Sequence, residues 1–348
     1  MKIEVLKVKS KSKVIGFLKK YKMQIFITFL LSIITYFFVT KSSHYINVFI
    51  EGMLLYGTKV LPSLLPFLFI TKILSNFDFI FYVCSKFKFL SKFLFNTPQI
   101  SFYIFFMSII SGYPIGAKLT SEFYEKGLIT NEDAQKILSY CSTSGPLFVI
   151  GSVGVGFFAS SFTGVLLFLN HVVSSVINGV IFGHIKIKKT NTQSFLNQKQ
   201  KPQKNDPSNN FKNFSLDDIM YNSIRSVLIV GGFIIIFYVF IQIMLDNNFL
   251  LPLTKLFELL GLSCVESKGF CAGLFEITKG VSILSTSNNI QLSFILSSFL
   301  ISFSGISILM QSFTFLDKTK INKKLFIFQK LCHATISALI AYPLSFLL

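Results

Sequence analysis

Long apolar stretches separated by short polar ones dominate this sequence. Membrane-spanning helices are predicted over residues 23–39, 48–74, 146–159, 164–185, 226–245, 292–316 and 325–347. Several of them reach the roughly 20 residues that a helix needs to cross the hydrocarbon core of a bilayer. The pattern therefore predicts an all-α polytopic membrane protein.

Polar, helix-breaking residues interrupt two of the apolar regions. One break covers residues 111–114, after an apolar run at 99–110 and before a polar helix that Gly127 ends. The other lies within residues 269–285. An interrupted backbone leaves N–H and C=O groups unpaired, which a membrane tolerates only beside protein or a water-filled cavity. We expect the first region to enter the membrane and turn back rather than to cross it.

The remaining segments divide the chain. Amphipathic, interfacial segments are predicted at residues 76–96 and 250–260. Residues 186–215 contain seven Lys and one Asp and cannot bury a core, so a disordered cytoplasmic linker is expected there. The predicted units are a basic N-terminus (1–22), a first helix with its outer loop (23–47), a first repeat (48–185), this linker and a second repeat (216–348).

The two halves carry the same motif pattern. The first reads Gly112-x5-Lys118 and then Ser142-x-Ser144-Gly145; the second reads Gly273-x5-Lys279 and then Ser302-x-Ser304-Gly305. Four basic stretches hold 22 of the 33 Lys and Arg, and cytoplasmic loops collect such residues. On that assignment the N-terminus is cytoplasmic, and the two broken segments enter from opposite faces. Inverted-topology repeats with broken helices are typical of secondary transporters and place the binding site at the breaks.

The breaks also predict the chemistry of the solute. Half-helix N-termini present free N–H groups and the positive end of a dipole, which favour an anionic or strongly polar ligand, and Lys118 and Lys279 add positive charge. The candidate substrate-binding residues are Gly112, Tyr113, Pro114, Gly116, Lys118, Ser142, Ser144, Gly145, Glu276, Thr278, Lys279, Ser302, Ser304 and Gly305.

Several of these residues have a structural alternative. Lys118 and Lys279 can extend to a membrane interface instead of contacting a ligand. Glu122 and Glu276 can pair with those lysines. Asn170 and His171, inside the span 164–185, either line a pathway or form interhelical hydrogen bonds. Gln311 is a similar case, and His44 and His333 are expected to be structural or exposed.

Composition excludes other classes of function. The net charge of +18 comes from Lys clusters beside apolar spans, so anionic lipid, and not nucleic acid, is the expected partner. The five Cys show no metal-ligand spacing, and no metal or cofactor is expected. No catalytic motif such as G-x-S-x-G, H-E-x-x-H or Walker A is present, so the chain is not expected to be an enzyme.

The motifs at residues 111–118, 122–127, 141–154, 274–280 and 302–307 resemble those of YlbJ-type sporulation integral membrane proteins. These carry a gate or nucleoside-recognition domain shared with concentrative nucleoside transporter relatives. The resemblance implies movement of dipicolinic acid across the outer forespore membrane during sporulation. A nucleoside or other metabolite carrier of the same fold, or a non-transporting scaffold for spore assembly, are the alternatives. A homo-oligomer or a sporulation-protein partner stays open.

Overall fold

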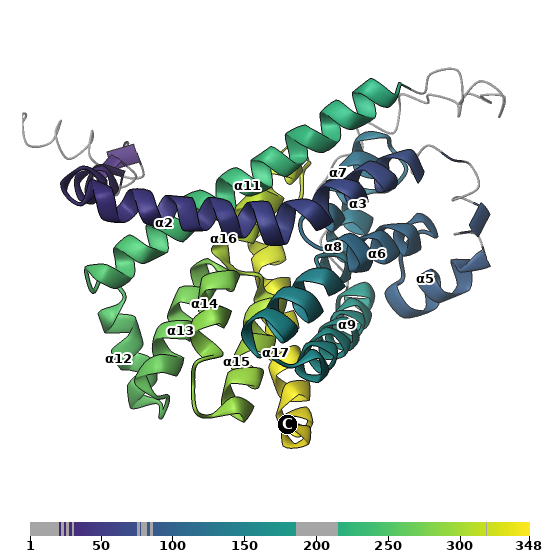
Figure 1. The fold of residues 1–348 in the computed structure, drawn as a ribbon. Helices are drawn as coiled ribbons and strands as arrows, with labels where there is room; N and C mark the ends of the chain where they lie inside the picture. The colour runs from purple at the N-terminus through teal and green to yellow at the C-terminus, as the bar shows by residue number, and fades with distance from the viewer. Residues whose placement is uncertain are drawn as a thin grey trace, which may run out of the picture.

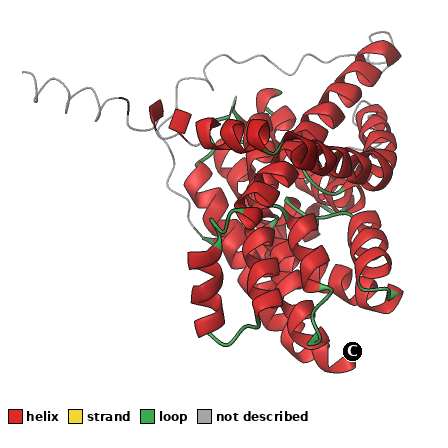
Figure 2. Cartoon of the chain, turned by 60° about the vertical axis from the view of Figure 1, so that its left-hand side comes forward, coloured by secondary structure: helices red, strands yellow, loops and turns green. Residues whose placement is uncertain are grey.

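The computed structural model describes residues 31–74, 86–185, 215–317 and 319–348, with isolated positions between 21 and 29 and between 77 and 83. Within these residues every regular element is a helix (Figure 2). Four helices are long and apolar enough to cross a membrane, and a fifth span is available if one bent pair counts as a single element. The predicted all-α polytopic architecture is confirmed. The predicted linker and the basic N-terminus lie almost entirely outside the described residues.

Two long helical segments cross one another over the rest of the fold (Figure 1). Helices α2 (Ser42–Leu55) and α3 (Leu61–Leu74) join through a π-helical segment, η1 (Tyr56–Val60). Both pack against α11 (Leu216–Asp246). The predicted span at 48–74 thus begins earlier, at Ser42, and remains helical through its prolines. Each long segment is followed by a short helix, α5 (Lys88–Phe95) or α12 (Leu251–Leu259), in the regions predicted to be amphipathic.

A pair of short helices follows in each half and turns at a break. Helix α6 (Ile100–Ser111) ends at Gly112, and α7 (Ile115–Glu125) begins after Pro114. Helix α13 (Cys264–Phe275) ends at Glu276, which also caps α14 (Ile277–Leu284). The helices within each pair pack against one another. Both predicted interruptions are confirmed as helix breaks.

Each pair leads into a broken segment and then an unbroken span. In the first half these are α8 (Asn131–Cys141), η2 (Leu147–Phe157) and α9 (Ser161–His184). In the second half they are α15 (Ile290–Phe303), α16 (Gly305–Leu316) and α17 (Lys323–Leu344). Thr130 and Asp133 form a capping box at the start of α8. The predicted span 292–316 is found as Ile290–Leu316, with a local break at Ser304, which adopts a left-handed conformation with φ of 75°.

In each pair the two helices meet at the break. The ends of the helices away from the break lie at one face of the molecule for α6–α7 and at the opposite face for α13–α14. The backbone N–H of Asn322, just before α17, donates to Gln135 Oε1 near the start of α8 at 3.0 Å. The loop from α7 to α8 therefore lies beside the start of α17. At the other end of α17, Leu348 lines a surface hollow with Asn288 and Asn289, between α14 and α15. The helix ends away from the break therefore lie beside the start of α17 for the α6–α7 pair and beside its end for the α13–α14 pair.

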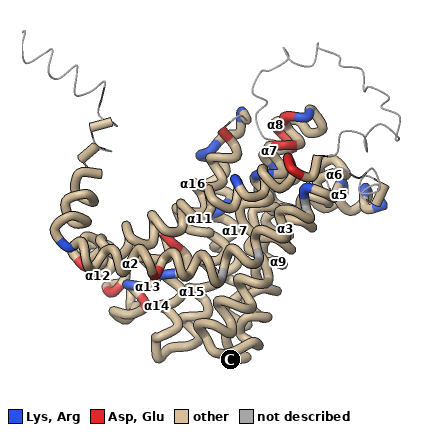
Figure 3. Tube along the Cα trace, turned by 45° about the horizontal axis from the view of Figure 1, so that its top comes forward, with Lys and Arg blue, Asp and Glu red and all other residues tan. Residues whose placement is uncertain are grey.

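Charge and exposure fit this arrangement in a membrane. Charged residues gather on α5, α7, α8 and the end of α16, and on α12 to α14, while α9 and α15 carry no Lys, Arg, Asp or Glu (Figure 3). Large apolar side chains such as Leu228, Ile236, Phe328 and Leu339 point outward and are more than half exposed. Outward apolar side chains on long helices suit contact with lipid.

Candidate functional site

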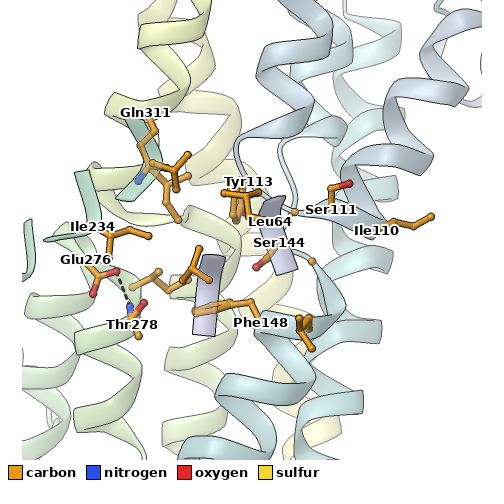
Figure 4. Close-up of a pocket in the computed structure, with 17 residues that line it drawn as sticks. Leu64, Ile110, Ser111, Tyr113, Ser144, Phe148, Ile234, Glu276, Thr278 and Gln311 are labelled. Carbon is orange, nitrogen blue, oxygen red and sulfur yellow. Dashed lines mark hydrogen bonds between the residues drawn. The ribbon is translucent and has the colours of Figure 1, made fainter. Parts of the chain in front are cut away.

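A small cavity lies where the helix breaks of the two halves meet (Figure 4). Tyr113 and Ser144 line it from the first half, and Glu276 and Thr278 line it from the second. Helix α11 contributes Ile234 and Val230, and Gln311 comes from α16. The cavity measures about 80 Å³, whereas small-molecule sites typically measure roughly 300–1,000 Å³. The cavity is lined mainly by apolar side chains, with a few polar groups, and in this conformation it has no room for a metabolite.

Contact between two backbones fixes the first-half side of the cavity. Gly112 has φ of 78°, and a Cβ atom at this position would lie 2.5 Å from the backbone nitrogen of Gly145. A side chain would be strained there both by its backbone conformation and by the lack of space. The two breaks of the first half, although 33 residues apart in sequence, are therefore packed directly on one another.

A buried lysine that the sequence analysis did not single out lies behind the packed breaks at Gly112 and Gly145. Lys330 of α17 is 1% exposed. Its Nζ donates to Ser142 O at 2.8 Å and to Tyr113 Oη at 3.0 Å. Tyr113 Oη donates in turn to the carbonyl of Ile301, at 3.0 Å. No carboxylate lies within 4.0 Å of this ammonium among the described residues.

His171 of α9 joins the two halves. The backbone N–H of Ser144 donates to its Nε2 at 2.8 Å, and its Nδ1 lies 2.8 Å from Ser302 Oγ. Its ring stacks on that of His333, with centroids 4.9 Å apart. Asn170 also forms interhelical bonds, to Ser298 and to Ser337. Both residues thus form the hydrogen bonds between helices that were one of the two alternatives, and neither lines the cavity.

The two lysines of the repeated motif lie outside the cavity. Lys118 is buried and its Nζ donates to Ser226 Oγ on α11. Lys279 Nζ lies over the ring of Tyr238, also on α11, 4.7 Å from its centroid. Both side chains therefore connect a half-helix to α11 in this conformation, and their contact with a solute stays a prediction.

The acidic residues also differ from their predicted pairing. The Glu276 carboxylate accepts the backbone N–H groups of Thr278 at 3.1 Å and Lys279 at 2.8 Å. Glu122 pairs with Lys72 at 2.6 Å, and not with Lys118. The N-terminus of α14 thus already has a carboxylate, supplied by the chain itself.

The structure divides the predicted site residues into two groups. Those that line the cavity are Gly112, Tyr113, Ser144, Gly145, Glu276 and Thr278. The others support the breaks or lie behind them: Pro114, Gly116, Lys118, Ser142, Lys279, Ser302, Ser304 and Gly305. Among the latter, Gly116 packs on the carbonyl of Cys141 and Gly305 on those of Gly273 and Phe275. No group of three or more potential metal ligands is found in the described part of the chain.

Comparisons with known proteins identify one curated relative. The chain is 29% identical over 317 residues to the sporulation integral membrane protein YlbJ of Bacillus subtilis (strain 168), covering 82% of this chain and 74% of that protein. The comparison supports a YlbJ-type assignment. No protein-family profile matches the chain, and no solved structure does.

Two signals in the sequence pointed to Lys330 and to the correspondence between His171 and His333. Lys330 stands within the apolar run 325–347, and an ionisable residue inside a span is a candidate functional residue by default. The second signal is a further match between the halves, Leu169-x-His171-x3-Ser175 and Leu331-x-His333-x3-Ser337. Gln311 was noted as polar within its span, and it lines the cavity.

Proposed function

We propose that this protein is a membrane carrier for a small anionic metabolite, dipicolinic acid in a sporulating cell. The observation that supports it best is the cavity enclosed by helix breaks from both halves. Secondary transporters bind their solutes between discontinuous helices, where the two repeats meet. The curated relative is named as a sporulation membrane protein, and dipicolinic acid and the outer forespore membrane follow from the resemblance to that family.

The order and packing of the elements support alternating access. Each half has a long helical segment, a short helix, a helix pair, a broken segment and an unbroken span. The contacts between the halves are reciprocal, because α7 packs against α16 while η2 packs against α14. Two inverted repeats that rock against each other would open a shared cavity first to one face and then to the other. The small cavity volume fits a closed intermediate in such a cycle.

The charge distribution supports an anionic solute on one side of the cavity. Lys330 is a buried cation without a carboxylate partner in the described residues, and it bonds to the cavity-lining Tyr113. An anion entering from this side would supply the missing opposite charge. The basic N-terminus and the other basic stretches also favour a cytoplasmic N-terminus, on the side from which dipicolinate would enter.

A specific observation favours the second candidate, a nucleoside carrier of the same fold. The far side of the cavity holds the Glu276 carboxylate, which repels a dianion. With Thr278 and Gln311 it offers hydrogen-bonding groups suited to a sugar or a base edge. Neither candidate needs a cofactor or enzymatic chemistry.

Uptake by proteoliposomes containing the purified protein tests both candidates. Labelled dipicolinate should enter, or exchange, faster than in protein-free vesicles, and labelled uridine should not. Uridine transport without dipicolinate transport would select the nucleoside carrier. If a folded, reconstituted protein moved neither solute, the proposed function would be rejected.

A cavity-filling substitution ties uptake to this site. Ile234→Trp should reduce uptake roughly tenfold or more, because extra volume in a packed cavity costs about 1–3 kcal/mol or more. Ile236→Trp is the matched control, since Ile236 lies two residues away on α11 and is 66% exposed. Equal loss in both variants would show that the cavity is not the transport site.

A further inference from the structure

The direction of one hydrogen bond defines the protonation state of His171. A backbone N–H can only donate, so the bond from Ser144 N requires an unprotonated lone pair on Nε2. The single proton of the neutral ring is then on Nδ1, which donates to Ser302 Oγ. The imidazole is therefore neutral in this conformation, and it bridges the Ser142–Gly145 break of the first half to the second half.

The matching histidine of the second half lies in contact with it. His171 and His333 are each ten residues beyond the first residue of their helix, Ser161 in α9 and Lys323 in α17. His333 Nε2 lies 3.1 Å from Ser174 Oγ, and its Nδ1 is buried without a hydrogen-bond partner among the described residues. A pair of imidazoles thus occupies the junction of the two halves, next to both broken helices.

The groups around His171 disfavour a second positive charge. Tyr113 faces it from the α6–α7 break, and Lys330 and His333 face it from α17. Helices α15 and η2 contribute no titratable side chain. The remaining titratable groups on helices packed against α9 are Lys323, Lys324, Cys332 and Tyr342 of α17, Cys141 at the near end of α8 and, further along α8 and α5, Tyr140, Lys136, Asp133, Glu132, Lys92 and Lys88. No carboxylate is within 4.0 Å of either imidazole among the described residues.

Binding of a proton is therefore incompatible with the closed arrangement. A proton on Nε2 would place a donor opposite the N–H of Ser144, and that bond would be lost. The imidazolium would also lie close to the Lys330 ammonium in surroundings of low dielectric constant. Both effects would be relieved if the Ser142–Gly145 break moved away from α9 and water entered.

We propose that His171 is a proton-binding site that couples movement of the broken helices to the proton gradient. In the neutral state it holds the cavity closed by joining Ser144 to Ser302. When it binds a proton it releases Ser144, and the cavity opens. The coupling to solute flux rests on the carrier function proposed above, whereas the proton-dependent opening does not.

A single-tryptophan reporter tests the opening without any solute. The natural chain contains no Trp, so Phe148→Trp places one fluorophore in the cavity wall. Acidification from pH 8 to pH 5 should shift its emission to the red as water enters, and His171→Gln should remove that shift. Glutamine can accept from Ser144 and donate to Ser302 but does not bind a proton in this range. His171→Leu serves the same purpose if the glutamine variant does not purify as a folded protein.

Two controls define the outcome. Phe328→Trp, on the exposed surface of α17, should show no shift on acidification. The Phe148→Trp reporter combined with His333→Gln should keep its shift. The proposal is overturned if the Phe148→Trp reporter does not respond to acid, or if it responds equally with and without His171.

Uptake measurements then separate this inference from the proposed function. At clamped voltage, an inward proton gradient should accelerate dipicolinate uptake, with up to about tenfold accumulation per pH unit for one proton per solute. His171→Gln should retain solute exchange and lose the response to the gradient. Exchange without any gradient response in the natural protein would refute the coupling alone, whereas absence of both uptake and exchange would refute the carrier.

Discussion

Replacement of Gly116 by alanine should prevent this protein from folding stably. Gly116 lies at the start of α7, where a Cβ atom would be 1.6 Å from Cys141 O and 2.6 Å from its carbonyl carbon. Both atoms belong to the backbone at the end of α8, so the clash cannot be relieved by rotation of a neighbouring side chain. Overpacking costs typically about 1–3 kcal/mol and more where backbone must move, which exceeds the roughly 1 kcal/mol that alanine gains over glycine in a helix.

Gly232→Ala is the matched control for this prediction. Gly232 is also in a helix, α11, and nothing lies within 4 Å of the position of its missing Cβ. The control should be as stable as the natural protein or slightly more stable. Thermal unfolding in detergent, followed by size-exclusion chromatography, compares the two. If Gly116→Ala unfolded at the same temperature as Gly232→Ala, the close packing of α7 on α8 would be wrong.

The helix breaks were predictable because local chemistry determines them. Gly112 and Pro114 interrupt an apolar run, and Thr130 with Asp133 marks a helix start. Ser304 is a weaker signal, since serine is common within membrane helices and only the repeated S-x-S-G motif indicated its importance. The break there depends on tertiary contact, because Gly305 packs on carbonyl groups of α13.

The partners of the charged groups were not predictable from one sequence. Lys118 and Lys279 occupy matching positions beside the breaks, but a lysine side chain is long enough to reach several neighbours. Their partners, Ser226 and Tyr238, lie on α11, whose crossing direction is a property of the assembled fold. Pro66 lies inside α3, which remains helical and packs against α11.

Lys330→Met should strongly reduce dipicolinate uptake while leaving the protein about as stable as before. Removal of the ammonium leaves Ser142 O and Tyr113 Oη without this donor, at a cost of about 1–3 kcal/mol for each buried group. It also removes a buried charge that has no carboxylate partner in the described residues, and burial of such an ion costs several kcal/mol. The two effects are similar in size, so stability should change little.

Transport should respond very differently from stability. Loss of a charge-assisted contact with a carboxylate costs about 1.5–3 kcal/mol, or roughly 10- to 100-fold in uptake at low solute concentration. Lys118→Met is the matched control, because Lys118 is also buried and also donates to a serine, but its partner Ser226 does not line the cavity, whereas Lys330 donates to the cavity-lining Tyr113. It should keep uptake near that of the natural protein. Loss of uptake in Lys118→Met but not in Lys330→Met would assign the anion contact to the repeated motif, as the sequence pattern first predicted.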